Sequence, residues 1–79
     1  MSPSPYNTLG ANLAYERKRR ALTMRELAAR GGMYASEISR LERGQRDPRL
    51  STLIRISLAL EIPLVELLRG VGEPPAARR

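Results

Sequence analysis

Glycine and proline interrupt this chain at short intervals, and these interruptions limit the length of any regular element. Breaks fall at the Gly31-Gly32 pair, at Gly44, at Pro48 and at Pro63. The segments between them carry apolar residues three or four positions apart, which places side chains on one face of a helix. No segment alternates apolar and polar residues over a useful length, so no sheet is expected. The sequence therefore predicts an all-α fold built from short helices.

Local signals mark the ends of five helices in a compact domain. The first helix is expected from about Asn7 to Arg20, with Asn7 or Thr8 as its cap. The second opens at Thr23-Met-Arg-Glu26, which has the spacing of a capping box, and it ends at the Gly31-Gly32 pair. The other helices are expected at about 35–43, at about 50–60, and from Pro63 through Leu64, Leu67 and Leu68.

The two ends of the chain lack this periodicity. Residues 1–6 contain two prolines, and residues 70–79 contain two glycines and two prolines. We therefore predict a flexible arm over residues 1–6, a folded domain over residues 7–69 and a flexible tail over residues 70–79.

The composition argues against an enzyme. The 79 residues allow one small core, and they include no cysteine and no histidine. No disulfide framework, metal site or cofactor is expected, and neither a phosphate-binding glycine loop nor a nucleophile–base pair is recognisable. Glu37 and Glu42 lie five positions apart on a helix, so they point in different directions and do not share a substrate.

Positive charge is concentrated in the first two thirds of the chain. The net charge is +6, and residues 1–49 carry ten of the 14 Lys and Arg residues but five of the eight Asp and Glu residues. A basic surface attracts phosphate, so nucleic acid is the first expected partner and an anionic membrane surface the second. No apolar run approaches the roughly 20 residues of a membrane span, and short glycine-capped helices argue against surface insertion. We expect a cytoplasmic protein without membrane contact.

The second and third helices have the spacing of a helix-turn-helix. That motif needs a small residue where the helices touch, a glycine in the turn and a branched apolar anchor in the second helix. Ala28, Gly32 and Ile38 supply these features at steps of four and six residues. Many helical hairpins would satisfy this spacing alone.

The surrounding residues resemble the XRE family of lambda-repressor-like proteins, which includes phage repressors and small bacterial regulators. The resemblance rests on Leu22-Thr-Met-Arg-Glu-Leu-Ala28, Ile38-Ser-Arg-Leu-Glu-Arg-Gly44, Pro48 and Leu64-Val-Glu-Leu-Leu68, and it covers about Leu9 to Leu68. It implies a transcriptional regulator whose third helix lies in the major groove of double-stranded DNA while the second crosses the backbone above it.

Mapped onto this chain, the resemblance places five residues near base edges: Ala35, Ser36, Glu37, Ser39 and Arg40. Arg40 is long enough to donate two parallel hydrogen bonds to guanine. Ser36 can donate or accept at short range, and Ala35 can offer a methyl contact. Glu37 can accept from a cytosine amine or orient Arg40. For each residue the alternative is a solvated helix face.

A second group of residues is suited to the DNA backbone. Arg43, Gln45, Arg46 and Arg49 lie in and around the loop after the third helix, and phosphate contacts there would fix the register. Arg49 can alternatively enter a narrow minor groove. Arg25 is a weaker phosphate candidate. Tyr34, which replaces the usual Ser or Thr cap of the third helix, can contact the sugar-phosphate backbone through its hydroxyl.

The resemblance also implies a structural ion pair between Arg17 of the first helix and Glu42 of the third. At three further positions the chain departs from the family pattern. Met24 stands where a glutamine often touches phosphate, Arg49 where a serine commonly caps the fourth helix, and Glu61 where glycine is common. The last substitution predicts a strained turn.

Leu58 falls between core positions, where the family usually has a polar residue. With Leu64 and Leu68 it is a candidate interface for a homodimer, which would pair two DNA half-sites about one turn (~34 Å) apart. The alternative is an antitoxin-like or coactivator-like module that uses the same fold mainly to bind another protein.

Overall fold

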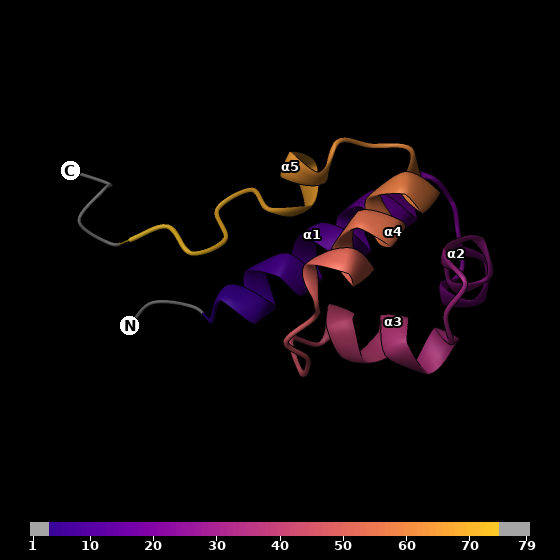
Figure 1. The fold of residues 1–79 in the computed structure, drawn as a ribbon, viewed down its shortest axis with the longest axis horizontal. Coiled ribbons are helices and arrows are strands. Elements are labelled where there is room, and N and C mark those ends of the chain that lie inside the picture. The colour runs from indigo at the N-terminus through magenta and orange to yellow at the C-terminus, as the bar shows by residue number, and fades with distance from the viewer. Residues whose placement is uncertain (1–3, 75–79) are drawn as a thin grey trace.

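The computed structural model describes residues 4–74, which form five helices and no strand (Figure 1). The helices are α1 (Pro5–Arg19), α2 (Met24–Gly31), α3 (Ala35–Glu42), α4 (Leu50–Leu60) and α5 (Leu64–Leu67). Helices α1 and α4 lie across the middle of the molecule, and α3 forms one edge of it (Figure 1). The predicted all-α fold is confirmed, and within residues 4–74 no helix is long and apolar enough to cross a membrane.

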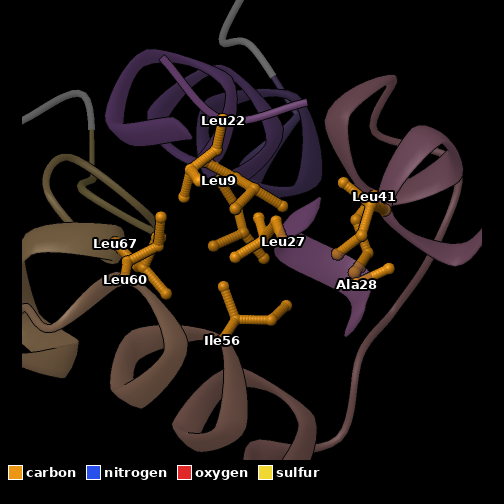
Figure 2. Packing of buried hydrophobic residues seen from close by; sticks show 10 residues of the cluster. Leu9, Leu22, Leu27, Ala28, Leu41, Ile56, Leu60 and Leu67 are labelled. Atoms are coloured by element: carbon orange, nitrogen blue, oxygen red, sulfur yellow. The ribbon is translucent and has the colours of Figure 1, made fainter. Parts of the chain in front are cut away.

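One hydrophobic core joins all five helices. Figure 2 shows how side chains from α1, α2, α3, α4 and α5 converge on a common centre, with Leu27 of α2 in the middle. Every member of this cluster is at most 8% exposed, and the members are Leu9, Leu13, Leu22, Leu27, Ala28, Ile38, Leu41, Ile56, Leu60 and Leu67. Such a core gives each short helix tertiary support, because isolated helices of this length are marginal in water.

Helix α1 begins two residues before the predicted position. Ser4 is its cap and accepts a hydrogen bond from the backbone N–H of Tyr6, while Pro5 occupies the first helical position. Proline suits this position because its fixed φ is helical and its missing N–H would have no partner there. Pro5 and Tyr6 are therefore helical rather than part of an arm, and residues 1–3 of the predicted arm lie outside the described residues.

The predicted tail also differs in its first residues. Residues 68–72 form turns, and Val71 is half-buried against the core. The Asn12 side chain donates hydrogen bonds to the carbonyls of Leu67 (2.8 Å) and Arg69 (2.9 Å). These bonds satisfy carbonyls at the end of α5 and attach that end to α1. Residues 75–79 of the tail lie outside the described residues.

The start of α2 and the turn between α2 and α3 both have the predicted structure. Thr23 accepts from the N–H of Glu26, and the Glu26 carboxylate accepts from the N–H of Thr23, so the capping box is complete. Gly32 has φ 67°, in the left-handed region, and the chain turns there into α3. Ala28 and Ile38 are both buried where the two helices pack.

Gly10 permits a close approach of α1 to α3. A glycine inside a helix normally costs about 1 kcal/mol relative to alanine. Gly10 is buried, and a Cβ atom there would lie 2.6 Å from the Glu42 carbonyl oxygen and would also overlap the Leu41 carbonyl oxygen. These are backbone atoms, so they cannot rotate away as a side chain would. The missing side chain therefore brings the end of α3 directly against α1.

We predict that Gly10→Ala lowers the free energy of unfolding by about 1–3 kcal/mol, although alanine is the better helix former. Gly31→Ala in α2 is the matched control, because a Cβ there meets only ordinary contacts, the nearest 3.6 Å away at Met33 Sδ. The control is expected to equal or exceed the wild type in stability. Urea denaturation followed by circular dichroism measures both, and a fully stable Gly10→Ala protein would contradict the close approach.

A buried ion pair holds the same junction. Arg17 Nε lies 2.6 Å from Glu42 Oε2, and Arg17 Nη2 donates to Glu42 Oε1 at 3.0 Å. The two side chains are 9% and 7% exposed. Arg17 Nη1 also donates to the Leu22 carbonyl at 2.8 Å. The hydrogen bonds to Glu42 raise the pKa of Arg17 above its ordinary value, so the guanidinium stays charged.

We predict that Arg17→Met destabilises the fold by about 3 kcal/mol or more, because it leaves the Glu42 carboxylate buried without a counter-charge. Adding Glu42→Leu is expected to recover part of that loss, since the second change removes the unpaired charge. Thermal and urea unfolding of the two variants provide the comparison. A single variant within about 1 kcal/mol of wild type would show that the pair contributes little.

Candidate nucleic-acid interface

One face of α3 presents a row of exposed polar side chains. Ser36, Arg40 and the C-cap residue Arg43 follow one another at steps of four and three residues, so they lie on the same side of the helix axis, and all three are exposed. The opposite side carries Ile38 and Leu41, which are buried in the core. Helix α3 lies at one edge of the molecule (Figure 1), and the exposure of these three residues shows that the row is open to solvent.

The other three residues predicted near base edges are less exposed. Ala35, Glu37 and Ser39 are half-buried, and Ala35 packs against the core. The Glu37 carboxylate accepts a hydrogen bond from the backbone N–H of Tyr34 at 3.0 Å, so it caps the start of α3. Sequence reasoning missed this role, although Glu37 has the N3 position that a capping box requires.

Tyr34 precedes α3 as its cap residue, and its side chain makes no capping hydrogen bond. The residue is 77% exposed, the largest exposure among the large hydrophobic residues of the described range 4–74. The hydroxyl is therefore accessible beside the N-terminus of the helix. Tyr34 therefore supplies no side-chain cap, and Glu37 compensates through its own bond to the backbone.

The loop between α3 and α4 extends the basic face. Gly44 has φ 72°, and the N–H of Gln45 donates to the Arg40 carbonyl at 3.0 Å, so the chain turns sharply at the end of α3. Gln45, Arg46 and Arg49 are all exposed beyond this turn. A shallow hollow of about 310 Å³ lies between the loop and α3, lined by Glu37, Leu41, Arg46, Asp47, Pro48, Arg49 and Thr52.

The arginines of this face carry unpaired charge. The three salt bridges within residues 4–74 involve Arg17, Arg20 and Arg69. None of them includes the exposed arginines Arg25, Arg40, Arg43, Arg46 and Arg49. These five side chains can therefore bind an anion without first breaking an internal contact.

The basic run Arg17 to Arg20 differs from the α3 arginines in that its members do not share one face. Arg17 pairs with Glu42, Arg20 pairs with Glu16 at 2.6 Å, and the Arg19 guanidinium lies 5.6 Å from the centre of the Tyr15 ring. As helical spacing predicts, the four basic residues point to different sides. They form no common basic patch.

Two departures from the family pattern have structural explanations. Met24 is half-buried and packs against the core, so it offers no polar group at the start of α2. Glu61 has φ 59°, the left-handed position that glycine usually takes at a helix end, which confirms the predicted strain.

The residues predicted for a dimer lie in different environments. Leu58 is 70% exposed, whereas Leu64 and Leu68 are partly buried and pack against the core. The exposed apolar residue of α5 is Val65. Leu58 is therefore the member of the set with most of its surface available to another molecule.

Two short helices joined at a left-handed glycine, with unpaired arginines on the outer face of the second, define a helix-turn-helix DNA-binding domain. The sequence profile of the helix-turn-helix family matches residues 13–67. The chain therefore belongs to the XRE-type helix-turn-helix family of transcriptional regulators, which are not enzymes.

Individual relatives agree with this assignment. The HTH-type transcriptional regulator y4dJ of Sinorhizobium fredii is 38% identical over 71 residues, which cover 90% of this chain and 92% of the relative. The crystal structure of the restriction-modification controller protein C.AhdI of Aeromonas hydrophila matches with a TM-score of 0.77 and 31% identity, covering 78% of this chain and 94% of that one. The clp gene regulator ClgR of Corynebacterium glutamicum matches with a TM-score of 0.83 and 28% identity, covering 89% and 91% of the two chains.

Proposed function

We propose that this protein is a homodimeric, sequence-specific DNA-binding regulator that reads the major groove with α3 and recognises a two-fold operator. The observation that carries the proposal is the exposed row of Ser36, Arg40 and Arg43 on a helix at the molecular edge. A helix of this diameter fits the major groove, where each base pair presents a distinct pattern of donors and acceptors.

Arg40 is the principal base-reading residue in this proposal. Its side chain is exposed and outside every salt bridge of residues 4–74, so its paired donors are available for guanine O6 and N7. Ser36 lies one turn earlier and can add a short hydrogen bond. Glu37, Ala35 and Ser39 stand at the margin of the contact, because each is half-buried.

The surrounding basic residues would hold the DNA backbone. Arg43, Gln45, Arg46 and Arg49 flank one end of α3, while Tyr34 lies at its start and Arg25 on the first turn of α2. Contacts from both ends of a short helix would fix its position along the groove without reading sequence. Arg49 is the residue of this group that can alternatively enter the minor groove.

The two roles predict different consequences for two arginine substitutions. Arg40→Ala is expected to weaken binding to the preferred site about ten- to hundredfold and unrelated duplexes much less. Arg46→Ala is expected to weaken both duplexes by a similar factor and to reduce the salt dependence of binding. Fluorescence-anisotropy titrations at several salt concentrations separate the two results. Equal losses on both duplexes from Arg40→Ala would remove it as a base reader.

A gel-shift titration tests the function itself. The probe is the duplex upstream of the protein's own gene, with excess unrelated competitor at two salt concentrations. We expect a shift that resists competitor, with stepwise bands where paired sites occur. If competitor and salt abolish the shift, a randomised duplex pool is selected next. Failure to enrich any sequence would favour the protein-binding module over a sequence-specific regulator.

A further inference from the structure

The outer face of α4 carries an apolar stripe. Leu50, Ile54 and Leu58 follow one another at steps of four residues and are 62%, 41% and 70% exposed. On a helix these positions lie within one narrow sector. The inner face of the same helix packs into the core through Ile56 and Leu60, so α4 is apolar on two sides. Nothing in residues 4–74 covers the outer side.

Opposite charges flank the most exposed residue of this stripe. Arg55 lies three positions before Leu58 within α4, and Glu61, the C-cap of the helix, lies three positions after it, so the two charges flank Leu58 at equal spacing along the chain. Both are exposed, and neither belongs to a salt bridge of residues 4–74. A small hollow of about 240 Å³ lies beside Leu58 on the basic side and is lined by Arg30, Gly31, Arg55, Leu58 and Ala59.

We propose that this face binds a second copy of the chain, with the two-fold axis passing beside Leu58. In an antiparallel pair of α4 helices with this register, Leu58 meets Leu58 of the second copy. The same rotation brings Arg55 of each copy to Glu61 of the other, so the dimer contains two such ion pairs and each charge is paired once. The inference rests on the proposed function, which requires a dimer, and it specifies where and in which register that dimer forms.

Self-complementarity favours a second copy over a foreign partner. A surface with opposite charges placed equally about a central leucine matches itself under a two-fold rotation, which is the requirement of an isologous interface. A uniformly acidic partner would meet Glu61 as well as Arg55. Because each copy carries a net charge of +6, two copies repel one another in general. Local opposite-charge pairs would therefore select the orientation in which they associate.

The charges also distinguish this register from one centred on Ile54. That alternative would set Leu50 against Leu58 and would bury the whole stripe. In that register Arg55 of each copy would lie level with Leu53 of the other, and α4 contains no acidic residue that could pair with it. The register centred on Leu58 instead sets Arg55 against Glu61 and leaves Leu50 outside the contact.

A matched pair of leucine substitutions tests the surface and the register together. Leu58→Ser is expected to raise the dimer dissociation constant of the full chain at least about tenfold, because each dimer loses two buried leucines. Leu50→Ser removes an equally large side chain from the same stripe and is expected to change the dimer dissociation constant less than about threefold. Analytical ultracentrifugation without DNA gives the constants, and circular dichroism checks folding. Equal effects, or no effect of Leu58→Ser, would overturn the proposal.

A charge-reversal cycle tests the ion pairs. Arg55→Glu and Glu61→Arg are each expected to raise the dissociation constant by about three- to tenfold, and the double variant is expected to restore it. If the effects of the two single variants on the dissociation constant simply add in the double variant, the proposed Arg55–Glu61 pairs do not form. A wild-type chain that stays monomeric at all concentrations would overturn the dimer proposal. The DNA-binding part of the proposed function is tested separately, because a chain that binds DNA without sequence preference would overturn it even if the chain dimerises.

Discussion

The junction of α1 with the end of α3 is the constraint on which the rest of the structure depends. The Arg17 guanidinium contacts Glu42 of α3 and the Leu22 carbonyl in the turn before α2, so one side chain joins three segments. Gly10 adds the close backbone approach at the same place. A buried pair of this kind contributes less to net stability than its Coulomb attraction suggests, but its geometry is demanding. It sets the direction of α3, and therefore the direction in which Arg40 points.

The molecule separates its tasks between two helices. Helix α3 and the loop after it carry unpaired arginines, whereas α4 carries an apolar outer face with one charge of each sign beside Leu58. Association of two chains through α4 would leave the arginines of α3 in solvent and ready for DNA. Because the two surfaces share no residue, substitutions on one can be interpreted without damage to the other. The core fixes the position of α3 relative to α4, because both helices pack against it through buried side chains.

Much of the fold follows from local signals in the sequence. Periodicity and capping rules find features that depend only on neighbouring residues. These features include the capping box at Thr23, the glycine at position 32 and the limits of α4. The contacts that sequence reasoning missed depend on residues far apart in the chain. The hydrogen bonds of Asn12 to the end of α5 span more than 50 residues, and the need for Gly10 appears only when α3 is in place. For the candidate site, the sequence identified the exposed arginines, but the half-buried state of Ala35 and the cap made by Glu37 depend on how α3 sits on the core.

Glu61 illustrates how stability and assembly can oppose each other at a single residue. Its backbone takes a left-handed conformation that costs a non-glycine residue roughly 1 kcal/mol, so glycine would make the monomer more stable. Glycine would also remove the acidic group that pairs with Arg55 of a second copy in the proposed dimer. The backbone N–H groups of Glu61 and Ile62 are bonded to the Leu58 and Ser57 carbonyls, so the main chain that carries this charge is already rigid before any partner arrives. In the proposed dimer little further backbone order would be lost on association, and a less stable single chain would be the better subunit.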